Sequence, residues 1–190
     1  MKPSLLRPWA LVAALSLSAL GNAGAAEYTS LDTGASTLTF SYSQMSVRMD
    51  GSFGELRSSE FSFDPANPEA AKVVLEVVLA SIDAGYAEAN TELEKDEWLA
   101  LAAHPVARFT SSKVQALGEG RYQVTGDLSI KGVTKEVTAP FTFKEDGDAG
   151  VFEGSLTFQR ADFGVGEGQW KDDSIVANDI QITFRVVANP

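Results

Sequence analysis

Apolar and polar residues alternate one by one along most of this chain, and this period of two constrains the fold more than any other feature. Between residues 37 and 43, for example, Leu38, Phe40 and Tyr42 alternate with serine and threonine. Successive side chains of a β-strand point to opposite faces, so this pattern predicts strands with one buried and one solvated face. Similar segments recur at 61–63, 73–79, 122–130, 141–143, 152–158 and 180–186. We expect about eight strands, most of them joined by short turns rich in Gly, Asp and Asn.

Strands in this number and order favour a mainly β fold, a single antiparallel β-barrel of about eight strands with one short helix between strands. A stacked sandwich is the alternative, but only closure into a barrel removes the exposed strand edges. A barrel of this size is either just filled by its own side chains or holds one small ligand. Periodicity does not decide between these two interiors.

One segment departs from the strand pattern and predicts a helix. Thr91-Glu92-Leu93-Glu94 has the form of a capping box, in which Thr91 and Glu94 satisfy each other's backbone amides. Pro105 disfavours helical geometry at the residue before it, so we expect the helix to end near residue 103. The helix either plugs or flanks the barrel, or acts as a lid whose Trp98 touches a ligand.

Residues 161–178 form the second irregular stretch. Glycines alternate at 164, 166 and 168, which predicts a mobile loop, whereas Phe163 and Trp170 are apolar. The stretch is either a gate over a cavity or a twisted hairpin whose aromatic residues lie in the core.

The N-terminus has the order of a cleavable signal peptide, with Lys2 and Arg7 before an apolar run and then small residues through Ala26. A membrane anchor is the alternative, but the apolar run is shorter than the roughly 20 residues that span a bilayer. We expect residues 1–26 to be removed on export and residues 27–190 to form one domain.

The composition narrows the function. Two bases and no acid lie in residues 1–26, so their removal changes the net charge from −11 to −13, which disfavours binding to nucleic acid or anionic membranes. There is no Cys to provide a disulfide or a thiolate nucleophile. His104 is the only histidine, which argues against a histidine metal cluster or a catalytic triad. We therefore expect a binding protein with no catalytic residues and no metal. Calcium at the acidic stretches 92–97 and 172–173 is a weak alternative.

Several segments resemble the YceI-like family, in the same order over essentially the whole mature chain. They include Phe61-Ser62-Phe63-Asp64-Pro65, Ala80-Ser81-Ile82-Asp83-Ala84-Gly85, His104-Pro105-Val106-Ala107-Arg108-Phe109, Gly126-Asp127-Leu128-Ser129-Ile130-Lys131-Gly132 and Arg160-Ala161-Asp162-Phe163-Gly164. The resemblance implies a lipocalin-like barrel in the periplasm that binds a polyisoprenoid chain, such as an isoprenoid quinone or a prenyl diphosphate.

The chain departs from the common family pattern at two positions, where Ala35 and Gln44 stand in place of histidines. This makes a quinone or another weakly polar head group a better expectation than a diphosphate. The Gln44-Met45 variant is similar to the branch associated with cytochrome b561-type membrane proteins, which implies such a partner. The alternative function is an enzyme or stress-response accessory that acts on such a lipid with this partner.

We predict nine ligand-binding residues. The expected lining or gating groups are Phe40, Tyr42, Phe53, Trp98, Phe163 and Trp170, and the expected head-group contacts are Gln44, Arg48 and Lys131. Each also has a structural alternative, because the aromatic residues fit an ordinary core and the two bases fit a solvated surface.

Overall fold

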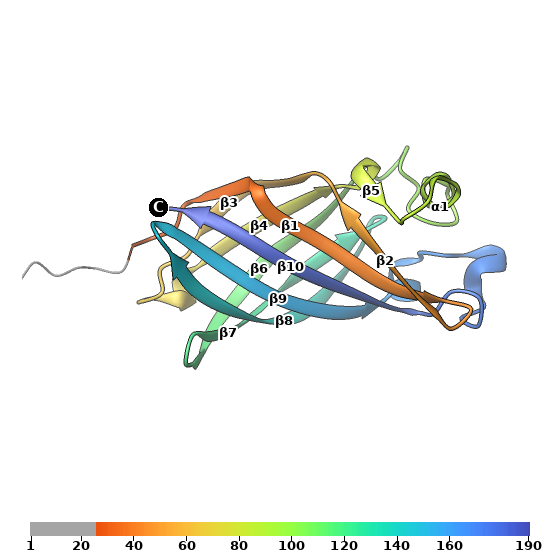
Figure 1. Ribbon diagram of the computed structural model, residues 1–190. Helices are drawn as coiled ribbons and strands as arrows, with labels where there is room; N and C mark the ends of the chain where they lie inside the picture. The colour runs from red at the N-terminus through yellow and green to blue at the C-terminus, as the bar shows by residue number, and fades with distance from the viewer. Residues whose placement is uncertain (1–25) are drawn as a thin grey trace, which may run out of the picture.

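The computed structural model describes residues 26–190, in which ten antiparallel strands form a single curled sheet with one short α-helix (Figure 1). The strands are β1 (Ser30–Gln44), β2 (Val47–Phe53), β3 (Leu56–Ser62), β4 (Lys72–Val78), β5 (Ile82–Asp83), β6 (Val106–Gly118), β7 (Arg121–Ile130), β8 (Val133–Asp146), β9 (Ala149–Gln159) and β10 (Asp179–Asn189). The helix is α1 (Ala87–Leu93), and four 3-10 turns are η1 (Pro68–Ala70), η2 (Leu79–Ser81), η3 (Arg160–Phe163) and η4 (Gly168–Lys171). Within residues 26–190, no helix is both long enough and apolar enough to cross a membrane. The predicted signal peptide lies almost wholly outside the described residues.

The sheet order is β3-β4-β6-β7-β8-β9-β10-β1-β2-β5, and the chain itself connects the two edges of this sheet. Strand β2 leads into β3 through Gly54 and Glu55, whose backbone groups bond to Ser81 (3.0 Å) and Val78 (3.1 Å). The mainly β, barrel-like fold is confirmed. The structure has ten strands and not the predicted eight, because the alternation did not identify β2 and β6 and because β5 has only two residues.

The end of the barrel that contains both ends of the described chain is closed by backbone pairing. Tyr28 and Phe63 form a bridge with two hydrogen bonds of 2.9 Å, and Thr29 donates to the carbonyl of Asn189 at 2.9 Å. A cluster of aromatic rings fills this end, and Phe63 packs edge-on against Phe152 with the ring centroids 5.0 Å apart. We call it the closed end.

Opposite the closed end, helix α1, the β1–β2 hairpin and the segment 160–178 gather around the other opening of the barrel, which we call the mouth (Figure 1).

The structure confirms the predicted helix but places it at different residues. Thr91 is not an N-cap, because it lies inside the helix and its hydroxyl donates to the carbonyl of Ala87 at 3.1 Å. The turn before the helix is held instead by Asn90, whose side-chain oxygen accepts from the amide of Ala84 at 2.7 Å. The helix ends at Leu93, because the next residues turn to bury Trp98 in the barrel.

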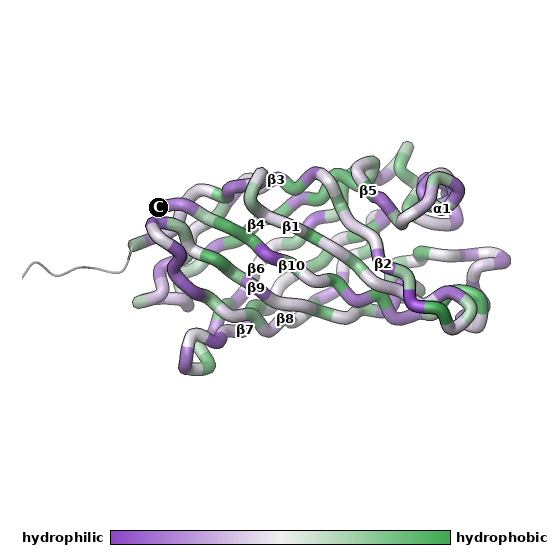
Figure 2. The backbone as a smooth tube through the Cα atoms, in the orientation of Figure 1, coloured by the Kyte–Doolittle hydropathy of each residue, from purple (hydrophilic) through white to green (hydrophobic). Residues whose placement is uncertain are grey.

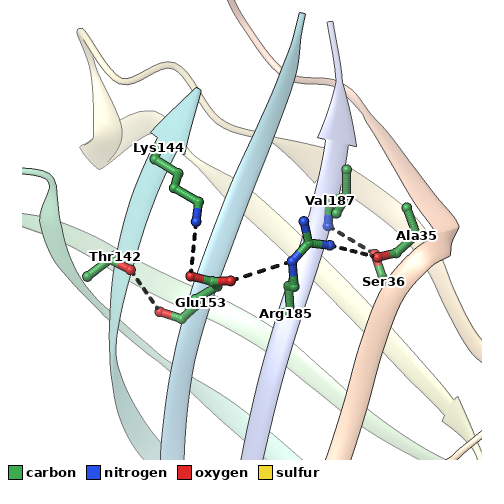
Figure 3. A network of polar contacts seen from close by, with 7 residues as sticks. All are labelled: Ala35, Ser36, Thr142, Lys144, Glu153, Arg185 and Val187. Atoms are coloured by element: carbon green, nitrogen blue, oxygen red, sulfur yellow. Dashed lines mark hydrogen bonds and ion pairs between the residues drawn. The ribbon is translucent and has the colours of Figure 1, made fainter. Parts of the chain in front are cut away.

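Hydropathy changes from residue to residue along the strands (Figure 2), and the inward-facing residues among them are mainly apolar. Figure 3 shows one cross-strand network, in which Glu153 pairs with Lys144 and Arg185, each at 3.5 Å. In the same network the Ser36 hydroxyl accepts from the amide of Val187 at 3.0 Å, where a register shift interrupts the pairing of β1 with β10. Such solvated pairs each contribute less than about 1 kcal/mol, so the stability of the barrel depends on its interior.

Candidate ligand-binding cavity

The barrel encloses a cavity of about 500 Å³ that extends between the closed end and the mouth. Residues of all ten strands line it, and nearly all of them are aliphatic or aromatic. The lining includes members of both hydrophobic clusters, from Phe63 and Phe152 at the closed end to Trp98 and Val176 at the mouth. The interior is therefore not fully filled by its own side chains.

Strand β1 shows how the sequence builds this wall. Leu38, Phe40, Tyr42 and Gln44 occupy alternate positions, and all four border the cavity. The ring of Phe40 stacks on that of Tyr42 with centroids 6.0 Å apart and planes inclined by 24°. Gly51 faces Phe40 across the β1–β2 pairing, and a Cβ atom there would lie only 2.3 Å from the ring. This glycine gives the Phe40 ring its space.

At the mouth, α1 and the turns that follow it meet the segment 160–178 through tryptophan side chains. The rings of Trp98 and Trp170 lie 5.4 Å apart, and the Trp170 indole N–H donates to Glu92 at 3.1 Å. Glu92 also accepts a hydrogen bond from Lys95, and this bond is the main reason why the pKa of Glu92 is lowered. The indole nitrogen of Trp98 is buried and has no partner among the described residues.

Arg160 organises the segment 160–178 from within. Its side chain is only 2% exposed and lies 5.5 Å from the Trp98 ring centroid. The guanidinium makes five hydrogen bonds to backbone carbonyls, those of Ala177 (3.2 Å), Val165 (2.9 Å), Gly166 (3.0 Å), Trp170 (2.7 Å) and Val176 (2.7 Å). Burial lowers the pKa of Arg160, although the charge of Asp173 partly opposes this shift. The segment is thus an ordered loop with two 3-10 turns and not a hairpin.

A small polar group lies at the rim of the mouth. The Tyr86 hydroxyl, in the turn before α1, donates to the side-chain oxygen of Gln44 at 3.1 Å. The pKa of Tyr42 is raised, first by burial and then by its interaction with Tyr86, so this phenol is neutral at ordinary pH. The backbone of Gln44 is fixed by its bridge to Val176 in the segment 160–178.

The structure separates the nine predicted ligand-binding residues into two groups. Those that border the cavity are Phe40, Tyr42, Gln44, Phe53, Trp98 and Trp170. Phe163 is only 1% exposed and packs edge-on against Phe158 in the core behind the lining. Arg48 alternates with inward residues, lies on the outer face and pairs with Asp50 at 3.1 Å. Lys131 donates to the carbonyl of Gly164 at 2.7 Å and so tethers the segment 160–178.

Three residues important to the mouth were not selected from the sequence: Tyr86, Glu92 and Arg160. Arg160 was noted only within a motif, because no pattern distinguishes a buried arginine from a solvated one. The contacts of Tyr86 and Glu92 join segments that are distant in sequence, so only the fold brings them together. Among residues 26–190, no three His, Asp or Glu side chains form a group that could hold a metal ion.

Comparison with known sequences shows one matching family model, the YceI-like domain, over residues 29–188. A UPF0312 protein of Azotobacter vinelandii is 38% identical over 122 residues, which are 60% of this chain and 62% of the relative. The matched segment thus spans about six tenths of the length of that relative.

Solved structures agree with this match. The crystal structure of BcnA from Burkholderia cenocepacia superposes with a TM-score of 0.80 at 35% identity, and the alignment covers 84% of this chain and 99% of BcnA. A polyisoprenoid binding domain from Saccharophagus degradans, implicated in plant cell wall breakdown, has a TM-score of 0.67 at 17% identity, with 86% and 99% covered. The second likeness concerns the fold alone.

Proposed function

This chain belongs to the YceI-like domain family, and on that premise we propose that it binds a long apolar isoprenoid lipid, an isoprenoid quinone or a polyprenyl chain, inside its barrel. The observation that carries the proposal is the cavity of about 500 Å³ with its almost wholly apolar lining. This volume lies within the range of roughly 300–1,000 Å³ that is typical of ligand pockets. The polyisoprenoid binding domain of Saccharophagus degradans, which shares the fold, supports the same class of ligand.

A long apolar lipid can bind tightly in such a cavity with few polar contacts. Burial of each methylene contributes about 0.8 kcal/mol, so a chain of 20 carbons gains roughly 15 kcal/mol from the apolar wall. Lost translational and rotational freedom and the ordering of the chain remove roughly half or more of this gain. A net affinity in the micromolar range or better is therefore expected without any charged anchor. A binding role needs no nucleophile, so we propose a carrier and not an enzyme.

The proposal is tested by filling the cavity from within. Ala139 on β8 borders the cavity and is 3% exposed, so Ala139→Phe places a ring in the ligand's path. Glu136→Phe on the same strand places the same ring on the exposed outer face and is the matched control. Native mass spectrometry and lipid extraction of protein from its own host should show an isoprenoid species on the parent chain and on the control.

The expected result is loss of that species from the Ala139→Phe protein at unchanged circular dichroism. If the parent chain retains no isoprenoid and takes none up from solution, the carrier proposal is wrong. Turnover of an added quinone or polyprenyl compound by the purified protein would instead favour the enzyme alternative.

We further propose that the protein works in the periplasm and delivers its lipid to a cytochrome b561-type membrane protein. The signal-like residues 1–26 support export, and the Gln44-Met45 pair supports the partner. Met45 lies at the tip of the β1–β2 hairpin beside the mouth and is 68% exposed, so a partner has access to it. Osmotic-shock release of a chain that begins near Glu27 tests the first part. Co-purification with such a cytochrome, reduced by Met45→Ser, tests the second.

A further inference from the structure

We propose that the mouth selects a lipid with an uncharged, hydrogen-bonding head group, such as a hydroxyl or a carbonyl, and discriminates against phosphates, with Gln44 and Tyr86 as the head-group contacts. This inference rests on the proposed function, because it concerns the polar end of the lipid whose chain fills the cavity. It follows from the charges that border the cavity and from the polar group at its rim.

The basic residues of the lining offer nothing to a phosphate. Arg160 is buried, and each of its five hydrogen bonds already ends on a backbone carbonyl. Arg108 lies between the inward-facing Ala107 and Phe109, so its side chain leaves the barrel and pairs with Glu76 at 3.1 Å. A phosphate at the mouth would therefore lack the bidentate arginine contacts that usually bind it.

Two carboxylates occupy the same region. Glu88 and Glu92 lie four residues apart on the side of α1 that borders the cavity. Glu92 is held by Trp170 and Lys95, whereas Glu88 is exposed and takes part in no hydrogen bond or ion pair recorded among residues 26–190. A diphosphate would meet the unpaired carboxylate of Glu88, whereas the charge of Glu92 is partly balanced by Lys95. One like charge at about 4 Å weakens binding by roughly fivefold even in high dielectric.

The rim supplies groups that suit a neutral head. Gln44 uses its oxygen to accept from Tyr86, which leaves its amide N–H groups to donate to a ligand oxygen. Tyr86 is 38% exposed, and its phenolic oxygen can accept a hydrogen bond from a ligand hydroxyl. Both residues border the cavity, and so does the neutral phenol of Tyr42 next to them. A ligand carbonyl can therefore accept from Gln44, and a ligand hydroxyl can also donate to Tyr86, with no charge buried in either case.

The experiment compares three ligands with the same C20 isoprenoid chain: geranylgeraniol, geranylgeranyl diphosphate and the hydrocarbon without a head group. Dissociation constants are measured by quenching of tryptophan fluorescence at low and high salt. We expect the alcohol to bind roughly tenfold or more tightly than the diphosphate at low salt, and the difference to narrow at high salt.

Variants separate charge from hydrogen bonding. Glu88→Gln should tighten diphosphate binding by roughly fivefold relative to binding of the alcohol. Gln44→Leu should weaken the alcohol by roughly 2- to 12-fold, the effect of one neutral hydrogen bond, and leave the hydrocarbon unchanged. Tyr86→Phe should act in the same direction. Gln181→Leu makes the same glutamine-to-leucine change as Gln44→Leu, but on the exposed outer face of β10, and should have no effect on binding.

The outcomes are distinguishable. If none of the three ligands binds, the proposed function itself fails. If the hydrocarbon binds but the diphosphate equals or exceeds the alcohol, the carrier stands and the inference about the head group is overturned. The inference about the head group is also overturned if Gln44→Leu and Gln181→Leu have the same effect on binding of the alcohol.

Discussion

Replacement of Arg160 by lysine keeps the positive charge but should lower the free energy of unfolding substantially. Arg160 is 2% exposed and donates five hydrogen bonds, all to backbone carbonyls of the segment 165–177. Lysine has only three donors on one nitrogen, so at least two carbonyls lose their partner. The ammonium is also more strongly hydrated than the guanidinium, so its burial costs more free energy.

The magnitude follows from these contacts. A hydrogen bond to a charged group contributes about 1.5–3 kcal/mol, and loss of two such bonds with partial relaxation gives a loss of about 3 kcal/mol in the free energy of unfolding. For a single domain with a urea slope near 2 kcal/mol per molar, the midpoint should fall by roughly 1.5 M. The loosened segment also borders the mouth, so amide exchange should accelerate there before it does in the strands.

Urea denaturation followed by circular dichroism measures the loss, with Arg185→Lys as the matched control. Arg185 is 39% exposed on the outer face, where it contacts Glu153 and the carbonyl of Ala35 (Figure 3), so its replacement should change stability by less than about 1 kcal/mol. Equal midpoints for the two variants would refute the idea that the five carbonyl contacts hold the segment in place.

Two further predictions concern packing and pH. Gly51→Ala places a Cβ within 2.3 Å of the Phe40 ring and should lower the free energy of unfolding by about 1–3 kcal/mol, measured by urea or thermal denaturation. Gly54→Ala is the control, because a Cβ there meets nothing closer than 3.5 Å and should have little effect. The pKa of Glu92 is lowered in the folded state, so its charge stabilises the mouth above the ordinary carboxyl pKa of 4.5, and this contribution is lost as the pH falls through the lower folded value. The emission of Trp170, which donates to Glu92, should change over that acidic range, and Glu92→Gln should abolish the change; an unaltered transition in that variant would contradict the assignment.

Much of the wall of the cavity was predictable, because the period of two depends only on strand geometry. The alternation at Phe40, Tyr42 and Gln44 correctly identified one face of β1, and all three residues border the cavity. The same rule applied to β2 places Arg48 outside, but β2 was not recognised as a strand, so its arginine was grouped with the head-group contacts. The register of β2 against β1 shows which face Arg48 occupies, because Arg48 pairs with the outward-facing Ser43.

The helix shows the opposite case. A capping box at Thr91 is a local signal, yet the helix begins four residues earlier, at Ala87, and ends before Trp98. Local capping contributes about 1 kcal/mol, whereas burial of Trp98 and Leu99 in the barrel contributes several, so tertiary packing determined where the helix ends. A signal from four residues does not outweigh that difference.

The sequence by itself determined a β domain with one apolar and one polar face per strand, because side-chain alternation and the hydrophobic effect act residue by residue. Only the tertiary structure decided that the apolar faces enclose a space of about 500 Å³, because that volume depends on how far apart the opposite walls stand. It also decided that the Arg160 guanidinium is directed at five backbone carbonyls and not at a ligand, while two glutamates and the Gln44–Tyr86 pair lie at the mouth. These groups come from distant parts of the chain, and only the closure of the barrel brings them to one opening.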